Sequence, residues 1–315
     1  MKKLFAIAAV VAVALTSCVK NEVITPDNEI SFKAVNYKNT KANFYGPVAS
    51  TAYPTNEHFG VYAFHSANGF ANTYMNNIEV EKYGSESYWR HATDTYYWPK
   101  DATLKFACYS PYEFGAGTVS ADASKGVYFT GFSTTNDLTQ QVDLMTSAVT
   151  AEMSNGTVPV PFQHLLSQIK FTVKTNKEYG AYDKVDSFRI NSVKFTVFSK
   201  ADYNNGVANY WDNHAATMEY NALAAEYYIT KDGSVQTLGI PVMIIPQTAV
   251  AITVDYTINY DNVNIVTTDY TFTPAVNWEK NTIYTYNLTI GLDEIKFEPT
   301  VVDWTTAAAE DFIID

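Results

Sequence analysis

Residues 252–260 have the sequence ITVDYTINY, in which apolar and polar side chains alternate without interruption. Successive side chains of a β-strand point to opposite faces of its sheet, so this alternation predicts a strand with one buried and one solvent-facing side. The same pattern recurs at residues 169–174 (IKFTVK), 193–197 (VKFTV) and 284–290 (YTYNLTI). Buried parallel strands are apolar at nearly every position, so the alternation favours antiparallel sheets.

Shorter strands are predicted upstream, at residues 30–34, 59–64, 104–109 and 127–129. The chain contains 24 Tyr and 18 Phe, and aromatic residues are enriched in strands. Only residues 215–228 have apolar spacing that is compatible with a helix. Regularly spaced strands separated by turns predict an all-β fold built from antiparallel β-sandwiches.

The chain has 315 residues, which is more than a single compact core usually contains, and this length favours two domains. The pattern changes at Pro159-Val160-Pro161, where two prolines precede the strongest alternation. We therefore place an N-terminal β-sandwich domain at residues 29–160 and a C-terminal one at residues 161–315.

The first 17 residues have the features of a secretory signal peptide. Lys2 and Lys3 precede an apolar run from residue 4 to residue 15, which is too short to span a bilayer as a helix. The sequence Leu-Thr-Ser-Cys that ends at Cys18 is similar to a bacterial lipobox, in which the cysteine is lipidated and becomes the first residue. Residues 18–28 then form a lipidated leader. The alternative is an ordinary signal peptide with a cysteine there by chance.

Charge and cysteine content exclude several classes of partner and chemistry. The net charge is -12, and removal of Lys2 and Lys3 with the signal leaves -14, which disfavours nucleic acid and anionic head groups as partners. With Cys18 lipidated, Cys108 has no cysteine to pair with. Cys108 shares an alternate face with Leu104 and Phe106, so we expect a buried core residue.

The sequence contains no recognisable catalytic or cofactor motif. Its five histidines lack metal-ligand spacing, and no phosphate-binding loop or nucleophile motif is present. His164 is expected to be a structural histidine. We predict no enzyme activity, no cofactor and no metal, although a carboxylate pair of the glycosidase kind stays possible among the scattered acids.

An aromatic cluster offers the one candidate binding site. Trp89, Tyr96, Tyr97 and Trp98 lie close together in the sequence, and their rings are suited to stacking against the apolar faces of sugars. The competing interpretation, which we favour, is that these rings fill the core at one end of a sandwich.

The order of several short motifs resembles the fimbrillin family of Bacteroidetes pilus proteins. The motifs are residues 30–34, 97–99, 104–107, 109–112, 142–145, 162–167, 245–248, 278–286, 295–297 and 302–304. The resemblance implies two tandem transthyretin-like β-sandwich domains. It also implies export as an outer-membrane lipoprotein and assembly with other fimbrial subunits into a homo- or hetero-polymer.

In the stalk subunits of that family, a protease removes the leader and the first strand, and a C-terminal strand of the next subunit fills the resulting groove. Here the resemblance assigns the removed strand to Ile30–Ala34 and the donor to Val301–Ile314. In the family the cut follows an arginine, but the only arginines here are Arg90 and Arg189. The nearest substitute places the cut between Lys41 and Ala42.

These features predict a protein of the cell surface, located in the outer membrane, in a fimbrium or in both, with a role in cell adhesion. Stalk, tip and anchor positions stay open, as does the ligand on a host or bacterial surface. The alternative function is a stand-alone surface lipoprotein that binds glycans through the aromatic cluster.

Overall fold

The computed structural model describes residues 28–36, 53–100, 102–152, 156–176, 185–205, 210–260, 263–291 and 295–303. Regular structure in these ranges is almost entirely strand, apart from one short 3-10 helix, η1 (Ala67–Phe70). The predicted all-β fold is confirmed. No helix within these ranges is both long and apolar enough to cross a membrane.

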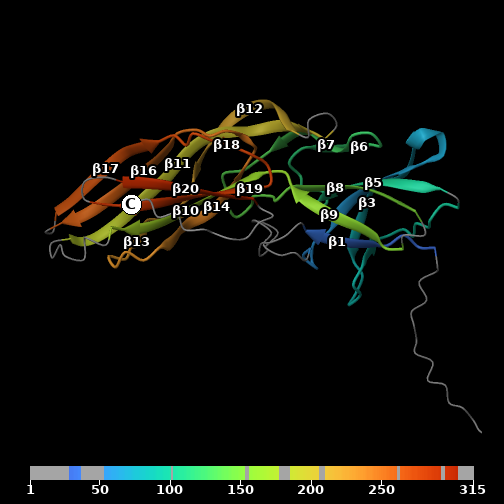
Figure 1. Ribbon diagram of the computed structural model, residues 1–315, viewed down its shortest axis with the longest axis horizontal. Coiled ribbons are helices and arrows are strands. Elements are labelled where there is room, and N and C mark those ends of the chain that lie inside the picture. The colour runs from blue at the N-terminus through green and yellow to red at the C-terminus, as the bar shows by residue number, and fades with distance from the viewer. Residues whose placement is uncertain are drawn as a thin grey trace, which may run out of the picture.

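Seven strands close into a barrel at one end of the elongated molecule (Figure 1). Each strand pairs with the next in the order β1, β4, β3, β2, β5, β8, β9, and β9 returns to β1. The strands are β1 (Phe32–Asn36), β2 (Phe59–His65), β3 (Asn72–Lys82), β4 (Trp89–His91), β5 (Thr103–Ser110), β8 (Met145–Glu152) and β9 (Val158–His164). Buried aromatic residues such as Phe59, Phe106 and Phe162 belong to its core.

Two further sheets extend away from the barrel and enclose a second core. The four-stranded sheet has the order β14 (Gln236–Ile244), β10 (Ser167–Thr175), β19 (Thr282–Ile290), β20 (Ile295–Asp303). The seven-stranded sheet follows the order β17 (Val263–Phe272), β16 (Ile252–Tyr260), β11 (Val185–Asn204), β7 (Gly126–Ser133), β6 (Thr118–Asp122), with β12 (Tyr210–Asn221) and β13 (Tyr227–Ile229) also paired to β11. A small pair, β15 (Gln247–Thr248) and β18 (Asn277–Trp278), completes the fold.

The two larger sheets pack against each other as the alternation predicts. Phe171 on β10 and Phe195 on β11 are both buried, with their ring centroids 6.2 Å apart. The polar residues between the inward-facing ones, such as Lys170 and Thr172, lie on the opposite face of the sheet. This arrangement is a β-sandwich with one buried face on each sheet.

The strands predicted from alternation are present, but the possible helix is not. Residues 215–221 belong to β12, which pairs antiparallel with β11, and residues 227–229 form β13. The helical interpretation of residues 215–228 is therefore wrong. Met218, Tyr220 and Ala222 all contact the core, which is the period of two that a strand requires.

The predicted boundary between residues 160 and 161 falls inside β9, a strand of the barrel. In addition, β6 and β7 precede that boundary in sequence but pair with β11 in the seven-stranded sheet. These pairings place strands from both sides of the predicted boundary in one sheet, but they do not by themselves decide the number of domains. The division into two tandem domains stays a prediction.

Candidate functional site

The strongest candidate site is the place of β1 in the barrel, which we call the β1 site and define as β1 with its pairing partners β4 and β9. Residues 30–34 alternate apolar and polar side chains, and Ile30, Phe32 and Ala34 are buried in the barrel core. The Phe32 ring meets the rings of Phe59 and Phe106 edge to face, with centroids 5.9 and 5.6 Å away. A single N-terminal strand therefore supplies part of the centre of this core.

On one side, β1 pairs in parallel with β9 over five residues, from Phe32 opposite Val158 to Asn36 opposite Phe162. The Val158 N–H donates a hydrogen bond to the Ser31 carbonyl at 2.8 Å. Figure 1 shows β1 in blue beside β9 in green. Parallel pairing is slightly weaker per residue than antiparallel pairing, and this contact is the longest that β1 makes.

Over residues 158–162, the sequence of β9 directs its main-chain N–H donors to the side that faces β1. In VPVPFQH, Pro159 and Pro161 alternate with Val158, Val160 and Phe162. In a parallel ladder, alternate residues direct their N–H and C=O groups to the same side, so the three non-proline residues direct theirs toward β1. The prolines have no N–H to direct the other way. The first five residues of β9 thus direct all of their N–H donors toward β1, and β9 pairs with β8 only beyond them, at Gln163 and His164.

On its other side, β1 is paired over a shorter length. Phe32 pairs with Trp89 in the short strand β4. Before that, the Ile30 N–H donates to the Tyr96 carbonyl at 2.9 Å, and the Trp98 N–H donates to the Asn28 carbonyl at 2.7 Å. The N-terminal strand therefore closes the barrel through main-chain hydrogen bonds on both sides.

One end of the β1 site carries buried charge. The Glu29 side chain is only 7% exposed, and its Oε1 lies 3.6 Å from Arg90 Nη1 and 3.6 Å from His91 Nε2. His91 Nε2 accepts a hydrogen bond from the Tyr96 N–H at 3.0 Å. Burial lowers the pKa of His91 and the neighbouring Arg90 lowers it further, so the ring is neutral at pH 7. Arg90 is then the cation that faces Glu29.

The aromatic cluster considered for sugar stacking is divided between core and surface. Trp89 and Trp98 are 6% and 7% exposed and belong to the barrel core, and Tyr96 packs against it. Buried rings have no free face for a sugar, so this placement does not support stacking on the two tryptophans. Tyr97, at 45% exposed, is the member of the cluster that presents its ring to solvent.

Three predicted site residues, Cys18, Lys41 and Ala42, lie outside the described residues. The predicted donor segment is only partly described. Its first three residues, Val301–Asp303, form the end of β20 and pair with β19 in the chain's own sheet. Residues 304–315 lie outside the described part of the chain.

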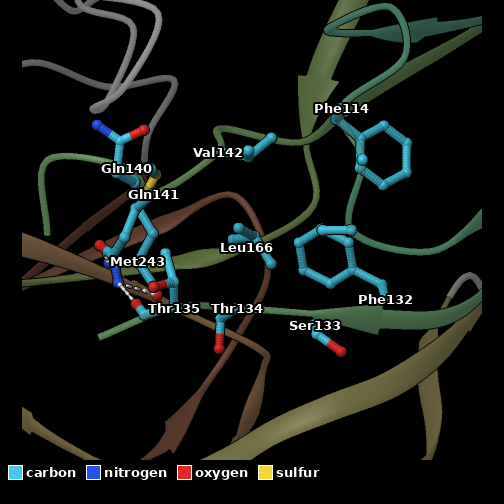
Figure 2. A pocket seen from close by; sticks show the side chains of 12 residues that line it. Phe114, Phe132, Ser133, Thr134, Thr135, Gln140, Gln141, Val142, Leu166 and Met243 are labelled. Carbon is cyan, nitrogen blue, oxygen red and sulfur yellow. Dashed lines mark hydrogen bonds between the residues drawn. The ribbon is translucent and has the colours of Figure 1, made fainter. Parts of the chain in front are cut away.

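A cavity of about 300 Å³ lies beside β14, where the loop after β7 meets it (Figure 2). The Gln141 side chain donates to the carbonyls of Thr135 and Met243 at 3.0 and 3.2 Å, and the Met243 N–H donates to Gln141 Oε1 at 2.8 Å. Phe132, which lines the cavity, is only 1% exposed. The Gln141 amide thus binds the backbone at the edge of β14, and the buried Phe132 ring offers little surface to a ligand.

His164 and Cys108, the two single residues considered for chemistry that the structure describes, have structural roles. His164 is buried, and its Nδ1 lies 2.8 Å from Asp143 Oδ1, as expected for a structural histidine. Cys108 is fully buried, and burial raises the pKa of its thiol, which confirms the core assignment. Across the described ranges, no group of three or more His, Cys, Asp or Glu side chains is placed to hold a metal ion.

A family model described as fimbrillin-like matches residues 26–304, which is most of the chain. The chain belongs to the fimbrillin-like family. The matched range begins before β1 and ends after β20 of this fimbrillin-like chain. A comparison with curated proteins finds no match.

Solved structures share the fold of this fimbrillin-like chain. A fimbrial protein from Bacteroides vulgatus ATCC 8482 is 21% identical with a TM-score of 0.66, and the match covers 88% of this chain and 100% of that one. A protein from Bacteroides ovatus ATCC 8483, described as a cell adhesion protein, is 15% identical with a TM-score of 0.56, covering 90% and 99% of the two chains. At these identities the similarity concerns the fold alone.

Sequence reasoning missed two features of the β1 site in this fimbrillin-like protein. The VPVP motif of β9 predicts a boundary, but prolines at alternate positions also fit a stretch of strand whose N–H donors all point to one side. The contact of Glu29 with Arg90 was not foreseen, because it joins segments that are distant in the sequence. The one available signal was that Arg90 is one of only two arginines in the chain.

Proposed function

We propose that this chain is a structural subunit, anchor or accessory protein of a fimbrium, assembled by β-strand complementation at the β1 site. Membership of the fimbrillin-like family supports a fimbrial or adhesive role and a location at the cell surface. Export as a lipoprotein through Cys18 and attachment to the outer membrane are part of the proposal.

The observation that carries the proposal is the position of β1 in the barrel. It is the first strand in the described part of the chain, it fills the core through Phe32 and Ala34 with Ile30 just before it, and it is bonded on both sides by main-chain groups. Removal of such a strand exposes apolar core and two unpaired strand edges, which is the arrangement that strand addition satisfies. A cut between Lys41 and Ala42 separates β1 from the rest of the chain.

The proposed donor is the C-terminal segment of a neighbouring subunit. Because Val301–Asp303 complete β20 in the chain's own sheet, residues 304–315 are the part that is best suited to leave and bind elsewhere. Their sequence, WTTAAAEDFIID, contains the apolar residues Trp304, Phe312, Ile313 and Ile314, which are able to replace the buried side chains of β1.

The test is to replace residues 304–315 with a Gly/Ser segment of the same length, which leaves β20 intact. Cell envelopes are then examined for oligomer ladders that dissociate only on heating. The proposal predicts that the ladders disappear while the subunit is still exported. Substitution of Tyr228, an exposed residue of β13, by Ser serves as a matched surface control. Ladders that persist unchanged after replacement of the segment would contradict strand complementation.

A second candidate function, glycan binding by a stand-alone lipoprotein, now depends on Tyr97. Its ring is 45% exposed, and the partly exposed rings of Tyr74 and Tyr96 lie nearby, 6.1 Å apart. A glycan array probed with the protein and with Tyr97→Ala tests it, because the surface substitution spares the core. Absence of binding to any glycan, or binding that Tyr97→Ala leaves unchanged, counts against this function.

A further inference from the structure

The buried carboxylate of Glu29 is poorly satisfied in the position it occupies. Its Oε1 has no hydrogen-bond partner in the described part of the chain, and the nearest cationic atom, Arg90 Nη1, is 3.6 Å away. A charge buried to this extent is costly unless a charge of opposite sign lies close by. Arg90 is therefore the group that makes a carboxylate tolerable at this end of β1.

Arg90 is positioned by elements that do not include β1. Its guanidinium carbon lies 3.3 Å from the centroid of the Tyr83 ring, and Tyr83 stacks on Tyr88 with centroids 5.8 Å apart. Tyr83 and Tyr88 lie in the connection between β3 and β4, and Arg90 is in β4. This support stays in place when β1 leaves, and so does the positive charge.

From this geometry we infer that Arg90 makes the β1 site favour an incoming strand that carries a carboxylate at the position of Glu29. The inference rests on the proposed function, because it concerns which strand the vacated site accepts. Without Glu29, the 31% exposed guanidinium loses the carboxylate 3.6 Å from it, while Glu81 of β3 stays opposite Arg90 in the β3–β4 pairing. A strand with an acid at the position of Glu29 restores the lost pair. A strand with a neutral residue at that position does not restore the ion pair with Arg90.

The strand that binds beside the positive charge of Arg90 is the C-terminal segment of a second subunit of the same kind. Residues 304–315 contain three acidic side chains and no Lys or Arg. The protein as a whole carries a net charge of -12, which repels an acidic strand at long range. A preference for an acidic strand over a neutral one must therefore come from a local cation such as Arg90.

The experiment uses the full chain with a specific protease site inserted between Lys41 and Ala42. Cleavage leaves β1 bound without a covalent link. Fluorescent peptides of residues 28–36 (NEISFKAVN) are then added, and their exchange into the protein is followed by anisotropy. The peptides are the natural sequence, Glu29→Gln, and Lys33→Gln, which changes an exposed charge on the same strand. A peptide of residues 304–315 is included as the natural donor.

Each peptide is measured against the unsubstituted protein, against Arg90→Gln and against Arg189→Gln. Arg189 is a matched control, because it also pairs with a glutamate, Glu226 at 2.9 Å, but lies on β11. We expect Glu29→Gln to weaken peptide binding about tenfold with Arg90 present, and less than about twofold in Arg90→Gln. Lys33→Gln and Arg189→Gln are expected to change binding by less than about twofold.

Equal affinity of the natural and Glu29→Gln peptides for the unsubstituted protein would overturn the role of Arg90 while leaving strand complementation intact. Failure of every peptide to exchange would instead contradict the proposed function and this inference together. If Arg90→Gln does not fold, the comparison of the two peptides on the unsubstituted protein still decides between these outcomes.

Discussion

At the scale of single residues, Phe32 is the side chain on which the packing of β1 depends most. It is 1% exposed and contacts two other buried rings. We predict that Phe32→Ala lowers the free energy of unfolding by about 3–5 kcal/mol, because it removes a large buried ring and leaves a cavity. Urea denaturation measures the change. Lys33→Ala, on the exposed face of the same strand, is the control and should change the free energy by less than about 0.5 kcal/mol.

Glu57 gives the protein a predictable dependence on pH. Burial raises the pKa of this carboxyl from 4.5 to about 7, against the opposing attraction of His58. Between pH 4.5 and 7 the folded protein therefore holds a proton that the unfolded chain has lost, so the free energy of unfolding falls as the pH rises.

We predict that Glu57→Gln removes this decline. The variant should be more stable than the unsubstituted protein at pH 8, by about 1 kcal/mol once partial screening by water is allowed for, and nearly equal at pH 4. Denaturation curves at both pH values provide the measurement, with Glu86→Gln, an exposed carboxyl, as the control. If the Glu57→Gln variant shows the same pH dependence of stability as the unsubstituted protein, the raised pKa of Glu57 is contradicted.

The role of Cys108 was predictable because its immediate neighbours in sequence determine it. Cys108 lies in an alternating strand, and alternation alone places it on the inner face. Glu29 and Arg90 differ, because neither has a local pattern that indicates its partner. Their contact arises when β1 is placed beside β4, and a single sequence contains no signal for that pairing.

At the scale of the element, β9 determines which side of the barrel can accept a strand. We predict that Val160→Pro lowers the free energy of unfolding by about 3 kcal/mol, because it removes a donor on the β1 side and adds a ring to the ladder. Pro161→Ala should change it by less than about 1 kcal/mol, since that position directs no N–H toward β1. Denaturation compares the two variants, and equal effects would contradict the direction assigned to the N–H donors of residues 158–162.

The outer edge of β14 is closed by a side chain in place of a strand. The Gln141 amide both donates to and accepts from the backbone of Met243, as a neighbouring strand would. We predict that Gln141→Ala lowers the free energy of unfolding by about 2–4 kcal/mol, because two buried backbone groups lose their partner. Gln140→Ala, one residue earlier and exposed, is the matched control and should have almost no effect. Thermal melting of both variants checks this.

Strand prediction succeeded for elements whose alternation is strict and failed where the apolar spacing also fitted a helix. Residues 215–228 contain five alanines, which favour helices, but nine residues of β12 pair with β11 and this tertiary pairing prevails. The β6 strand has little apolar character and is a strand because it pairs with β7. Pairing partners that are distant or weakly patterned cannot be inferred from local sequence.

At the scale of the whole molecule, the barrel and the sandwich share a third apolar cluster. Tyr109 on the outer face of the barrel meets Phe129 of β7 with centroids 6.1 Å apart, and Trp211 of β12 donates to the Leu165 carbonyl at 2.7 Å. The overall all-β class followed from alternation along the chain. The inclusion of β6 and β7 in the same sheet as β11 did not follow from that alternation, because it depends on contacts between residues that are distant in the sequence.

The central claim is that β1 is a replaceable strand, held in the precursor and exchanged on assembly. The most direct test is the N-terminal mass of subunits taken from assembled polymers, compared with that of unassembled protein from the same envelopes. The account predicts that unassembled chains begin with acylated Cys18 and that polymerised chains begin at Ala42, without β1. Polymers whose subunits all keep residues 28–36 covalently attached would contradict it.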